Sequence, residues 1–585
     1  MKKSLLVIGL LALFILTLIL NGSPFIFGDG YGYFHNAKTL TTTGTFLQTN
    51  KPEYFPYTGH AVTEESGKFV TVYPPGSSLL MWPFLSISKL ISSGTVYSDY
   101  YKAFDGHSLA DGVAVLLAAS FYMILAVLII YKLLRGLGFS TKITLVSLTA
   151  VYLGSYIITY TEQFASYSHI YEIFAVSLLL YCLYLFGRRF EYRYMLFAGL
   201  ATGLLVLTRP IDAVIVLPIF IFIAIYRNRK ALTYYLLGGA PFAFLFLAFN
   251  YTSYGNALST GYGSTEKLFD FSKFNLGNLL FSDVRGWFFY SPIMILASIG
   301  LILYARKNKP SFLIYLAPCI LLIALYSFWP NWWGGDSLGQ RFLMVLVPFM
   351  AIGLANLLKM IRDFRFASLY KPLILFVIVI CTFYSLIVTA LYRVTPTAIL
   401  YAENLDTAAR YPEVTPAERF TPIDILSYHL SAIMIDGFGT QRYWNDIQKG
   451  FNGGRSLALL AAGLTDPLAR IERVSDREFI LHLIPNNAGK SMLTNITVGI
   501  VQKDKYTTFN IANANFTKAS EIKFNCIEDI NCSADWKGTD AGTGYEREIL
   551  PKKTTDLKEV NYSSDLKVDF KADQTVNFVD YKLKY

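Results

Sequence analysis

One acidic residue, Asp29, stands among glycines and tyrosines shortly after an uncharged apolar run at residues 4–20. Residues 28–33 read Gly-Asp-Gly-Tyr-Gly-Tyr. The apolar run predicts a membrane segment, which places the carboxylate at the membrane surface. A carboxylate there can accept a proton from a substrate held between lipid and water. The Gly-Asp-Gly setting is also typical of a turn, so the residue by itself leaves both interpretations open.

Further ionisable and polar residues occur at the predicted outer ends of apolar runs. They are Glu162, His169, Glu172, Arg209, Asp212, Asp283, Arg285, Asp336, Gln340 and Arg341. Charges within a membrane are costly and usually functional. A transporter more often carries such groups near the midplane, where alternating access exposes them to either side. The placement at outer ends favours a cavity open to the outer leaflet and the exterior.

Several of these residues have structural alternatives. Arg209 and Arg341 are equally typical of side chains that extend to lipid phosphates. Glu162 and His169 fit a hydrogen-bonded pair at helix ends as well as an acid/base pair. Two adjacent tryptophans, Trp332 and Trp333, fit an interfacial aromatic belt as well as a platform that stacks on a sugar.

The elements that position these residues are predicted to be transmembrane helices. Of the 585 residues, 54% are hydrophobic and 16% charged, against roughly 25% charged in soluble proteins. Apolar runs that can cross or nearly cross a bilayer occur at 4–20, 112–134, 142–160, 168–187, 195–208, 211–226, 231–250, 287–304, 311–328, 341–360 and 371–392. The fold class predicted is a polytopic α-helical membrane protein with about eleven transmembrane helices.

Basic residues mark every second connection between these runs, as cytoplasmic loops do. The clusters contain Lys2, Lys3, Lys132, Arg135, Arg188, Arg189, Arg193, Arg227, Arg229, Lys230, Arg306, Lys307, Lys309, Arg362, Arg365 and Lys371. The pattern predicts a multi-pass protein of the cell membrane, in contact with membrane lipids, with a cytoplasmic N-terminus. The first loop, 21–111, and everything after about residue 392 are then exterior.

The last part of the chain, 393–585, has an ordinary charge content and alternating stretches at 478–483 and 566–570 that read as strands. We expect an exterior soluble domain there, α+β or mostly β. The net charge of +10 does not predict nucleic-acid binding. Residues before 393 contain 28 basic and 16 acidic side chains, and the remainder 23 and 25. The surplus therefore follows the membrane topology, and no basic stripe remains.

Six short motifs follow one another on the predicted exterior loops. They are Gly-Asp-Gly-Tyr-Gly-Tyr at 28–33, Val-Tyr-Pro-Pro-Gly at 72–76 with Met-Trp-Pro-Phe at 81–84, Tyr-Ser-His at 167–169, Leu-Thr-Arg-Pro at 207–210, Arg-Gly-Trp-Phe-Phe-Tyr-Ser-Pro at 285–292 and Trp-Trp-Gly-Gly-Asp-Ser-Leu-Gly-Gln-Arg at 332–341. In this order they resemble the GT-C membrane glycosyltransferases. Among these, the protein O-mannosyltransferase-like group (glycosyltransferase family 39) and the lipid A aminoarabinose transferase are most similar. The resemblance covers about residues 1–392, which we take as a transmembrane catalytic domain.

The resemblance implies that Asp29 faces the acceptor and that the donor is a polyprenyl-phosphate-linked sugar. One departure is that Asp29 is followed by Gly30, where many family 39 members carry a second acid. The Asp-x-Asp pair of metal-dependent GT-C enzymes is not matched either. We therefore expect no cofactor and no metal site.

The predicted reaction is a single inverting displacement in which Asp29 takes the proton of an acceptor hydroxyl and a lipid phosphate leaves. The acceptor is a protein, a lipid or a glycan. Arginine holds phosphate oxygens well, so Arg209, Arg285 and Arg341 are the predicted donor phosphate ligands. Glu162 and His169 are a predicted second acid/base pair. The predicted sugar and acceptor contacts are Tyr31, Tyr33, Tyr73, Trp332, Trp333 and Gln340. A flippase or transporter of lipid-linked sugars is the alternative function.

Overall fold

The structure is a computed structural model. It describes residues 22–24, 26, 28–52, 61–65, 67–92, 109–259, 261, 269–335, 337–364, 367–394, 409–415, 419–427 and 430, and the strands between 468 and 582. For these strands and for 91–92, 109, 367–369 and 393–394 only the backbone is described. The predicted first span, 4–20, and Asp336 lie outside the described residues.

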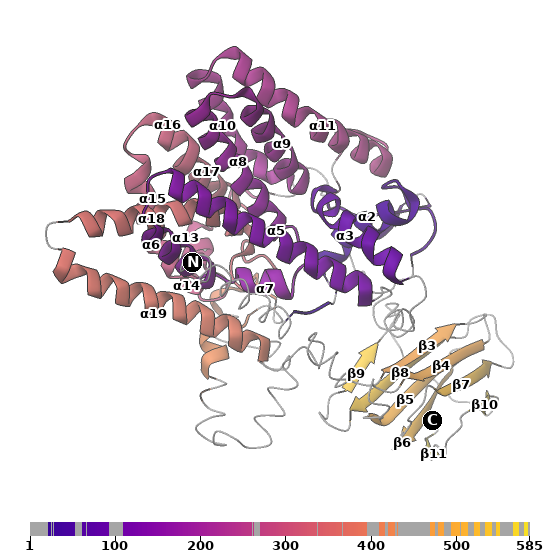
Figure 1. Cartoon of the computed structure of the whole chain (residues 1–585). Helices are drawn as coiled ribbons and strands as arrows, with labels where there is room; N and C mark the ends of the chain where they lie inside the picture. Colours follow the sequence, from indigo (N-terminus) through magenta and orange to yellow (C-terminus); the bar gives the residue numbers. More distant parts are fainter. Residues whose placement is uncertain are drawn as a thin grey trace.

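Helices make up the larger body in Figure 1. In chain order they are α2 (Gly30–Thr43), α3 (Gly76–Ser92), α5 (Leu109–Gly136), α6 (Thr141–Leu153), α7 (Ile157–Glu162), α8 (His169–Arg189), α9 (Tyr192–Thr208), η2 (Pro210–Asp212), α10 (Ala213–Tyr226), α11 (Arg229–Tyr254), α13 (Leu276–Phe281), α14 (Trp287–Tyr290), α15 (Ile293–Ala305), α16 (Lys309–Ser311), η3 (Phe312–Leu316), α17 (Ala317–Tyr326), η4 (Arg341–Leu346), α18 (Val347–Asp363) and α19 (Ala367–Val394).

Six helical segments of the described chain are long and apolar enough to cross a membrane. They are Ala110–Gly136, His169–Arg189, Arg229–Tyr254, Lys309–Tyr326, Arg341–Asp363 and Tyr370–Tyr392. Four shorter apolar helices, at Thr141–Leu153, Tyr192–Thr208, Pro210–Tyr226 and Ile293–Ala305, coincide with four further predicted spans. The polytopic helical class agrees with this arrangement, whereas the predicted number of about eleven spans is not confirmed.

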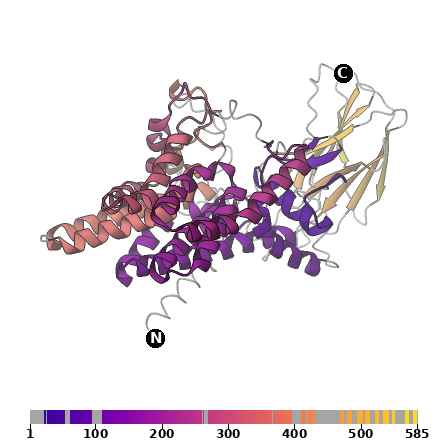
Figure 2. The same ribbon diagram turned by 90° about the horizontal axis from the view of Figure 1, so that it is seen from above.

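Two of these segments differ strongly in how they are packed. In the segment from Arg341 to Asp363, which includes α18, 89% of the most apolar 18-residue window is buried. In the segment Tyr370–Tyr392 of α19 only 22% of that window is buried, and Figures 1 and 2 both show α19 at the edge of the helical body. Its exposed side chains include Leu373, Phe376 and Phe383, which suits contact with lipid acyl chains.

Glycines allow the closest helix contacts. A Cβ atom on Gly353 of α18 would lie 2.1 Å from the carbonyl oxygen of Ala297 on α15. A Cβ atom on Gly199 of α9 would lie 1.9 Å from the carbonyl oxygen of Tyr235 on α11. These backbones touch because no side chain separates them, as is common between membrane helices.

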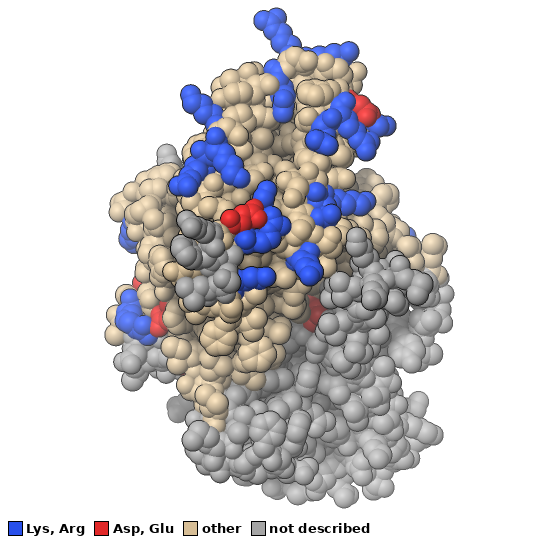
Figure 3. Space-filling view, turned by 60° about the vertical axis from the view of Figure 1, so that its left-hand side comes forward, with Lys and Arg blue, Asp and Glu red and all other residues tan. Residues whose placement is uncertain are grey.

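Basic side chains gather at one set of helix ends. Exposed Lys and Arg residues occur where α8 meets α9, α10 meets α11 and α15 meets α16: Arg188, Arg189, Arg193, Arg229, Lys230, Arg306, Lys307 and Lys309. Figure 3 shows a face of the helical body on which Lys and Arg side chains far outnumber Asp and Glu. The residues assigned above to the exterior lie at the opposite helix ends.

The strands β1 (Thr63–Glu65) and β2 (Lys68–Val70) form a hairpin in the first predicted exterior loop. It is tied to α2, because His35 Nε2 donates a hydrogen bond of 2.8 Å to the carbonyl oxygen of Phe69. The imidazole is buried, and burial lowers the pKa of His35 to about 4 despite the opposing effect of that hydrogen bond.

The C-terminal strands form two antiparallel sheets. Their bounds are β3 (Leu468–Arg473), β4 (Glu478–Ile484), β5 (Leu493–Gln502), β6 (Lys505–Ala512), β7 (Ser520–Cys526), β8 (Ser533–Asp540), β9 (Glu546–Ile549), β10 (Leu566–Lys571) and β11 (Phe578–Lys582). One sheet has the order β10-β7-β4-β3 and the other β11-β6-β5-β8-β9. Both stretches predicted as strands are strands, β4 and β10. The domain boundaries, 1–392 and 393–585, remain a prediction.

Candidate functional site

Asp29 of the first motif pairs with Arg341, the final residue of the last motif. Asp29 Oδ2 accepts a hydrogen bond of 2.7 Å from Arg341 Nη1, across 312 residues of sequence. The two side chains are 21% and 15% exposed, so the pair is partly open to solvent. Asp29 occupies the N-cap position of α2 but makes no side-chain cap hydrogen bond. An aspartate in this position usually caps its own helix, so its carboxylate here serves a tertiary contact instead.

A glycine makes room for this geometry. Gly28 has a φ of +54°, in the left-handed region that favours glycine. A Cβ atom on Gly28 would lie 2.5 Å from the hydroxyl oxygen of Tyr167. The Arg341 guanidinium in turn lies 5.7 Å from the centre of the Tyr167 ring. Gly28 therefore lets Asp29, Arg341 and Tyr167 converge.

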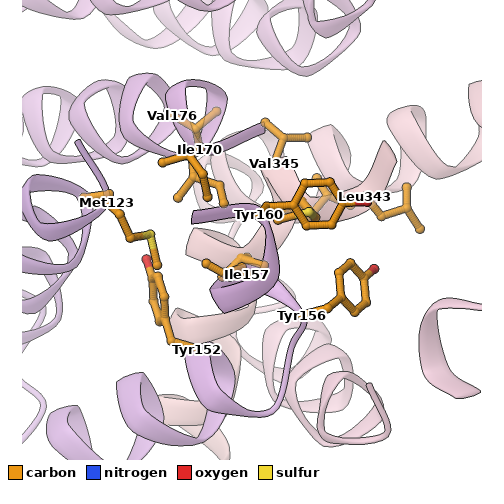
Figure 4. Close-up of a cluster of buried hydrophobic side chains, with 14 of the residues drawn as sticks. Met123, Tyr152, Tyr156, Ile157, Tyr160, Ile170, Val176, Leu343 and Val345 are labelled. Atoms are coloured by element: carbon orange, nitrogen blue, oxygen red, sulfur yellow. The ribbon is translucent and has the colours of Figure 1, made fainter. Parts of the chain in front are cut away.

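Two tyrosines hold the loop before Arg341: Tyr160 of α7, and Tyr156, which immediately precedes α7. The Tyr156 hydroxyl donates a hydrogen bond of 2.6 Å to the Gln340 carbonyl oxygen, and the Tyr160 hydroxyl donates one of 3.3 Å to that of Leu338. Figure 4 shows Tyr160 beside Leu343 of η4, in a cluster that also contains Met123 of α5. The Gln340 side chain is buried and donates a hydrogen bond of 2.7 Å to the carbonyl oxygen of Trp332 in the same loop.

A second set of charges lies deeper, where α8 begins and α9 ends. Glu172 Oε2 is 3.6 Å from His169 Nδ1 and 3.7 Å from Arg209 Nη1. Asp212, on η2, interacts electrostatically with both Glu172 and Arg209. Both acids are fully buried. Within the described part of the chain their four carboxylate oxygens make no hydrogen bond within 3.5 Å, so the group is held by charge at slightly longer range.

One aromatic ring connects the two sets. The guanidinium of Arg209 lies 5.3 Å from the centre of the Phe342 ring, and that of Arg341 lies 5.4 Å from the same centre. Tyr326 stacks on Phe342 with 4.6 Å between ring centres and 1° between planes. His169 lies within the electrostatic influence of both arginines. Two guanidiniums thus lie within cation–π distance of one phenyl ring.

The predicted tyrosines lie at this place, although they are buried. Tyr33 stacks against Tyr73 with 4.7 Å between ring centres. Tyr33 interacts electrostatically with Arg209, and Tyr73 with Arg341. Tyr31, on the same helix as Tyr33, is 2% exposed. Tyr33 therefore lies near Arg209, and Tyr73 near Arg341.

Other predicted site residues are engaged elsewhere. Arg285 is fully buried and donates from Nη1 to the carbonyl oxygens of Val284, at 2.6 Å, and Phe420, at 3.0 Å. Trp332 and Trp333 are 0% and 4% exposed and form a small core with Val284. The structure thus presents no open face of either indole ring, and their predicted contact with a sugar stays untested.

The predicted pairing of Glu162 with His169 stays a prediction. The ion pair that the structure gives His169 is with Glu172, one helical turn along α8. Glu162 is buried at the end of α7, and its backbone carbonyl oxygen accepts a hydrogen bond of 2.6 Å from the amide of Ser23. It therefore borders the segment that leads to Asp29.

Four residues to which the sequence analysis gave no role lie at the site in the structure: Glu172, Asp212, Tyr167 and Phe342. The spacing of His169 and Glu172, three residues apart at a helix start, is a usable signal, since such pairs share one helix face. Phe342 carries no sequence signal beyond its neighbour Arg341. Among the described residues no group of three or more His, Cys, Asp or Glu side chains is arranged to hold a metal ion.

No family model matches the chain, and no curated protein matches it. Three solved structures that superpose on it are oligosaccharyltransferases of Archaeoglobus fulgidus. One is the archaeal oligosaccharyltransferase AglB in complex with an inhibitory peptide and a dolichol-phosphate, with a TM-score of 0.42, 14% identity and coverage of 72% of this chain and 60% of that one. The apo form of the oligosaccharyltransferase gives a TM-score of 0.39 and 13% identity, with coverage of 69% of this chain and 57% of that one. The form tethered to an acceptor peptide gives a TM-score of 0.37 and 15% identity, with coverage of 78% of this chain and 58% of that one.

The chain thus spans about 60% of the length of the first of these structures. Both the identity and the TM-score of these structures are low.

Proposed function

We propose that this chain is a membrane glycosyltransferase that moves a sugar from a polyprenyl-phosphate-linked donor to an acceptor hydroxyl at the exterior membrane surface. The observation that carries the proposal is the Asp29–Arg341 pair, a carboxylate and a guanidinium 2.7 Å apart and partly open to solvent. A second guanidinium, that of Arg209, lies against the same Phe342 ring. Base and phosphate ligands, the two functions such a transfer needs, therefore adjoin.

The roles follow from the chemistry of the groups. The acceptor oxygen attacks the anomeric carbon and its proton passes to Asp29. The bond from that carbon to the phosphate oxygen breaks, and its electron pair leaves with the lipid phosphate. Negative charge grows on the departing phosphate, and Arg341 with Arg209 would stabilise it. Tyr33, near Arg209, and Tyr73, near Arg341, would contact the sugar.

The pairing itself adds a step. A carboxylate that accepts a charge-assisted hydrogen bond from arginine is a weaker base than a free one. The donor phosphate would take Arg341 over from Asp29, which frees the carboxylate to receive the acceptor proton. The base would then become available only when a donor is present.

The orientation of the site relative to the membrane is part of the proposal. The basic helix ends would face the cytoplasm and the Asp29–Arg341 pair the exterior, as the positive-inside rule requires. Reactivity of a cysteine introduced at the exposed Asn256, in protein whose five native cysteines are replaced by serine, with an impermeant maleimide on intact cells tests this placement. Labelling of that cysteine, but not of one introduced at the exposed Lys230, is the expected result.

Transfer by the purified protein tests the reaction. Protein in detergent receives labelled lipid-linked sugars extracted from the source cells, together with an extract of acceptors. Because detergent solution has no two sides, transfer there distinguishes an enzyme from a flippase. Asp29→Asn is expected to lower transfer by about 100-fold or more, the usual loss on removal of a general base. Asp270→Asn, a matched change in a predicted exterior loop, should leave it unchanged. Undiminished transfer by Asp29→Asn refutes the role of the base.

A further inference from the structure

The chain beyond α19 returns to the two loops that carry the last two motifs. We call residues 409–415 and 419–427 the strap. Arg410 in the strap donates a hydrogen bond of 2.6 Å from Nη1 to Asp283 Oδ2, and Phe420 places its ring 4.0 Å from the Arg285 guanidinium. The strap therefore fastens the loop at 282–286.

A separate contact fastens the loop at 329–341. The indole Nε1 of Trp332 donates a hydrogen bond of 3.2 Å to Glu413 Oε1. The ring of Tyr411 lies 5.6 Å from that of Trp332, and Val414 is fully buried against Trp332 and Trp333. One acid of the strap and two apolar side chains thus fix the position of Trp332.

This contact continues to Arg341. The carbonyl oxygen of Trp332 accepts the hydrogen bond from Gln340 Nε2, and Gln340 immediately precedes Arg341. Between them, Gly334, Gly335 and Gly339 all have positive φ values, of 79°, 76° and 64°. Glycines in such conformations leave a loop with little stiffness of its own. The direction of Arg341 consequently depends on what holds this loop. The hydroxyls of Tyr156 and Tyr160 hold its second end, and the strap holds Trp332 at its first.

We propose that the strap positions Arg341, and that Glu413 is the positioning residue that acts through Trp332 and Gln340. The inference rests on the proposed phosphate role of Arg341. It gives a structural task to Trp332, which the strap buries. It also links the chain that leads to the C-terminal sheets to the geometry of the site.

Binding of undecaprenyl phosphate to the full-length protein in lipid nanodiscs tests the inference. Glu413→Ala removes the acceptor of the indole N–H and should weaken binding about tenfold. Glu413→Gln keeps a side-chain oxygen that can accept this bond and should stay within threefold of the wild type. Arg410→Ala, the matched control, breaks the ion pair of the strap with Asp283 and leaves the hydrogen bond from Trp332 to Glu413 in place, so binding should also stay within threefold.

A second background separates positioning from a loss of folding. In Arg341→Gln protein, Glu413→Ala should cause no further loss of affinity, because the group that Glu413 positions is already gone. A merely structural role would lower affinity equally in both backgrounds and would lower the melting temperature. If Glu413→Ala fails to fold, Trp332→Phe removes the same hydrogen bond from the other side while keeping an aromatic ring, and the same comparison applies.

The outcomes separate this inference from the proposed function. If Arg341→Gln weakens binding but neither Glu413→Ala nor Trp332→Phe does, the positioning role is wrong and the phosphate role stands. If Arg341→Gln binds undecaprenyl phosphate as well as the wild type, the phosphate role is wrong and the inference falls with it. A tenfold loss that depends on Arg341 supports both.

Discussion

Replacement of Asp29 by asparagine should change donor binding and transfer in opposite directions. In the resting protein Arg341 donates its 2.7 Å hydrogen bond to Asp29. A lipid phosphate that needs the same guanidinium must therefore displace a carboxylate. Asp29→Asn removes the competing charge, so a lipid phosphate should bind more tightly although transfer is lost.

The size of the effect follows from the geometry of the pair. Opposite unit charges about 4 Å apart attract by about 4 kcal/mol at an effective dielectric constant of about 20, which suits a partly exposed pair. Side-chain exposures of 21% and 15% place Asp29 and Arg341 in this class. The asparagine oxygen still accepts a bond from Arg341 and retains much of the contact. About 1.4 kcal/mol should become available to the phosphate, which corresponds to tenfold tighter binding.

The assay is a double-mutant cycle on the affinity for undecaprenyl phosphate in nanodiscs, with Asp29→Asn, Arg341→Gln and the double variant. If the phosphate displaces Asp29 from Arg341, Asp29→Asn tightens binding tenfold in the wild-type background and by less than threefold in the Arg341→Gln background. If Asp29 merely repels the phosphate directly, the gain persists without Arg341. Equal gains in the two backgrounds, or no gain at all, refute the exchange of Arg341 between carboxylate and phosphate.

Three further substitutions test the loop that carries Asp29 and the packing of the helices. Gly28→Ala should lower transfer more than Gly67→Ala: both have a positive φ, of 54° and 74°, but only a Cβ on Gly28 meets the Tyr167 hydroxyl, at 2.5 Å. The pKa of His35 is about 4 when folded and 6.5 in its ordinary state, so the unfolded chain takes up the proton first as pH falls. Stability should drop by about 3 kcal/mol from pH 7 to 4, and His35→Gln should flatten this decline in melting temperature. Gly353→Ala should lower the melting temperature clearly at every pH, because its Cβ would lie 2.1 Å from a backbone oxygen of α15.

The sequence predicted those features of the site that a single stretch of residues determines, but not the contacts between residues far apart in the chain. Asp29 and Arg341 were assigned to the exterior side because the basic clusters alternate along the chain, and the structure brings the two together. Their direct pairing was not predictable, since 312 residues separate them. The break between α9 and α10, visible as Arg-Pro, correctly placed Arg209 at a helix end, with extended backbone angles of −145° and 114°. Its partner Glu172 was noted only as one charge among several.

The predictions for Arg285 and the tryptophans depended on motifs alone and missed what covers them. The strap carries Glu413 and Phe420 in a stretch with no apolar periodicity, so nothing in the sequence indicated that it returns to the earlier loops. A buried arginine or tryptophan in a motif is compatible with a ligand contact or with a tertiary contact. Only the position of the partner distinguishes these, and the partner lies far along the chain.

The two charged groups of the site are built for different tasks. The Asp29–Arg341 pair is balanced in charge, directly hydrogen-bonded and partly exposed, so an incoming anion can reach it and exchange with the carboxylate. The deeper group combines two fully buried carboxylates, one buried imidazole and the guanidinium of Arg209, which is 13% exposed, and its paired atoms lie 3.6 to 3.7 Å apart. Removing Arg209 would leave the two buried carboxylates without their permanent cation, which is costly. That group is suited to hold Arg209 against Phe342, whereas under the proposed function the exchange of Arg341 between carboxylate and phosphate belongs to the outer pair.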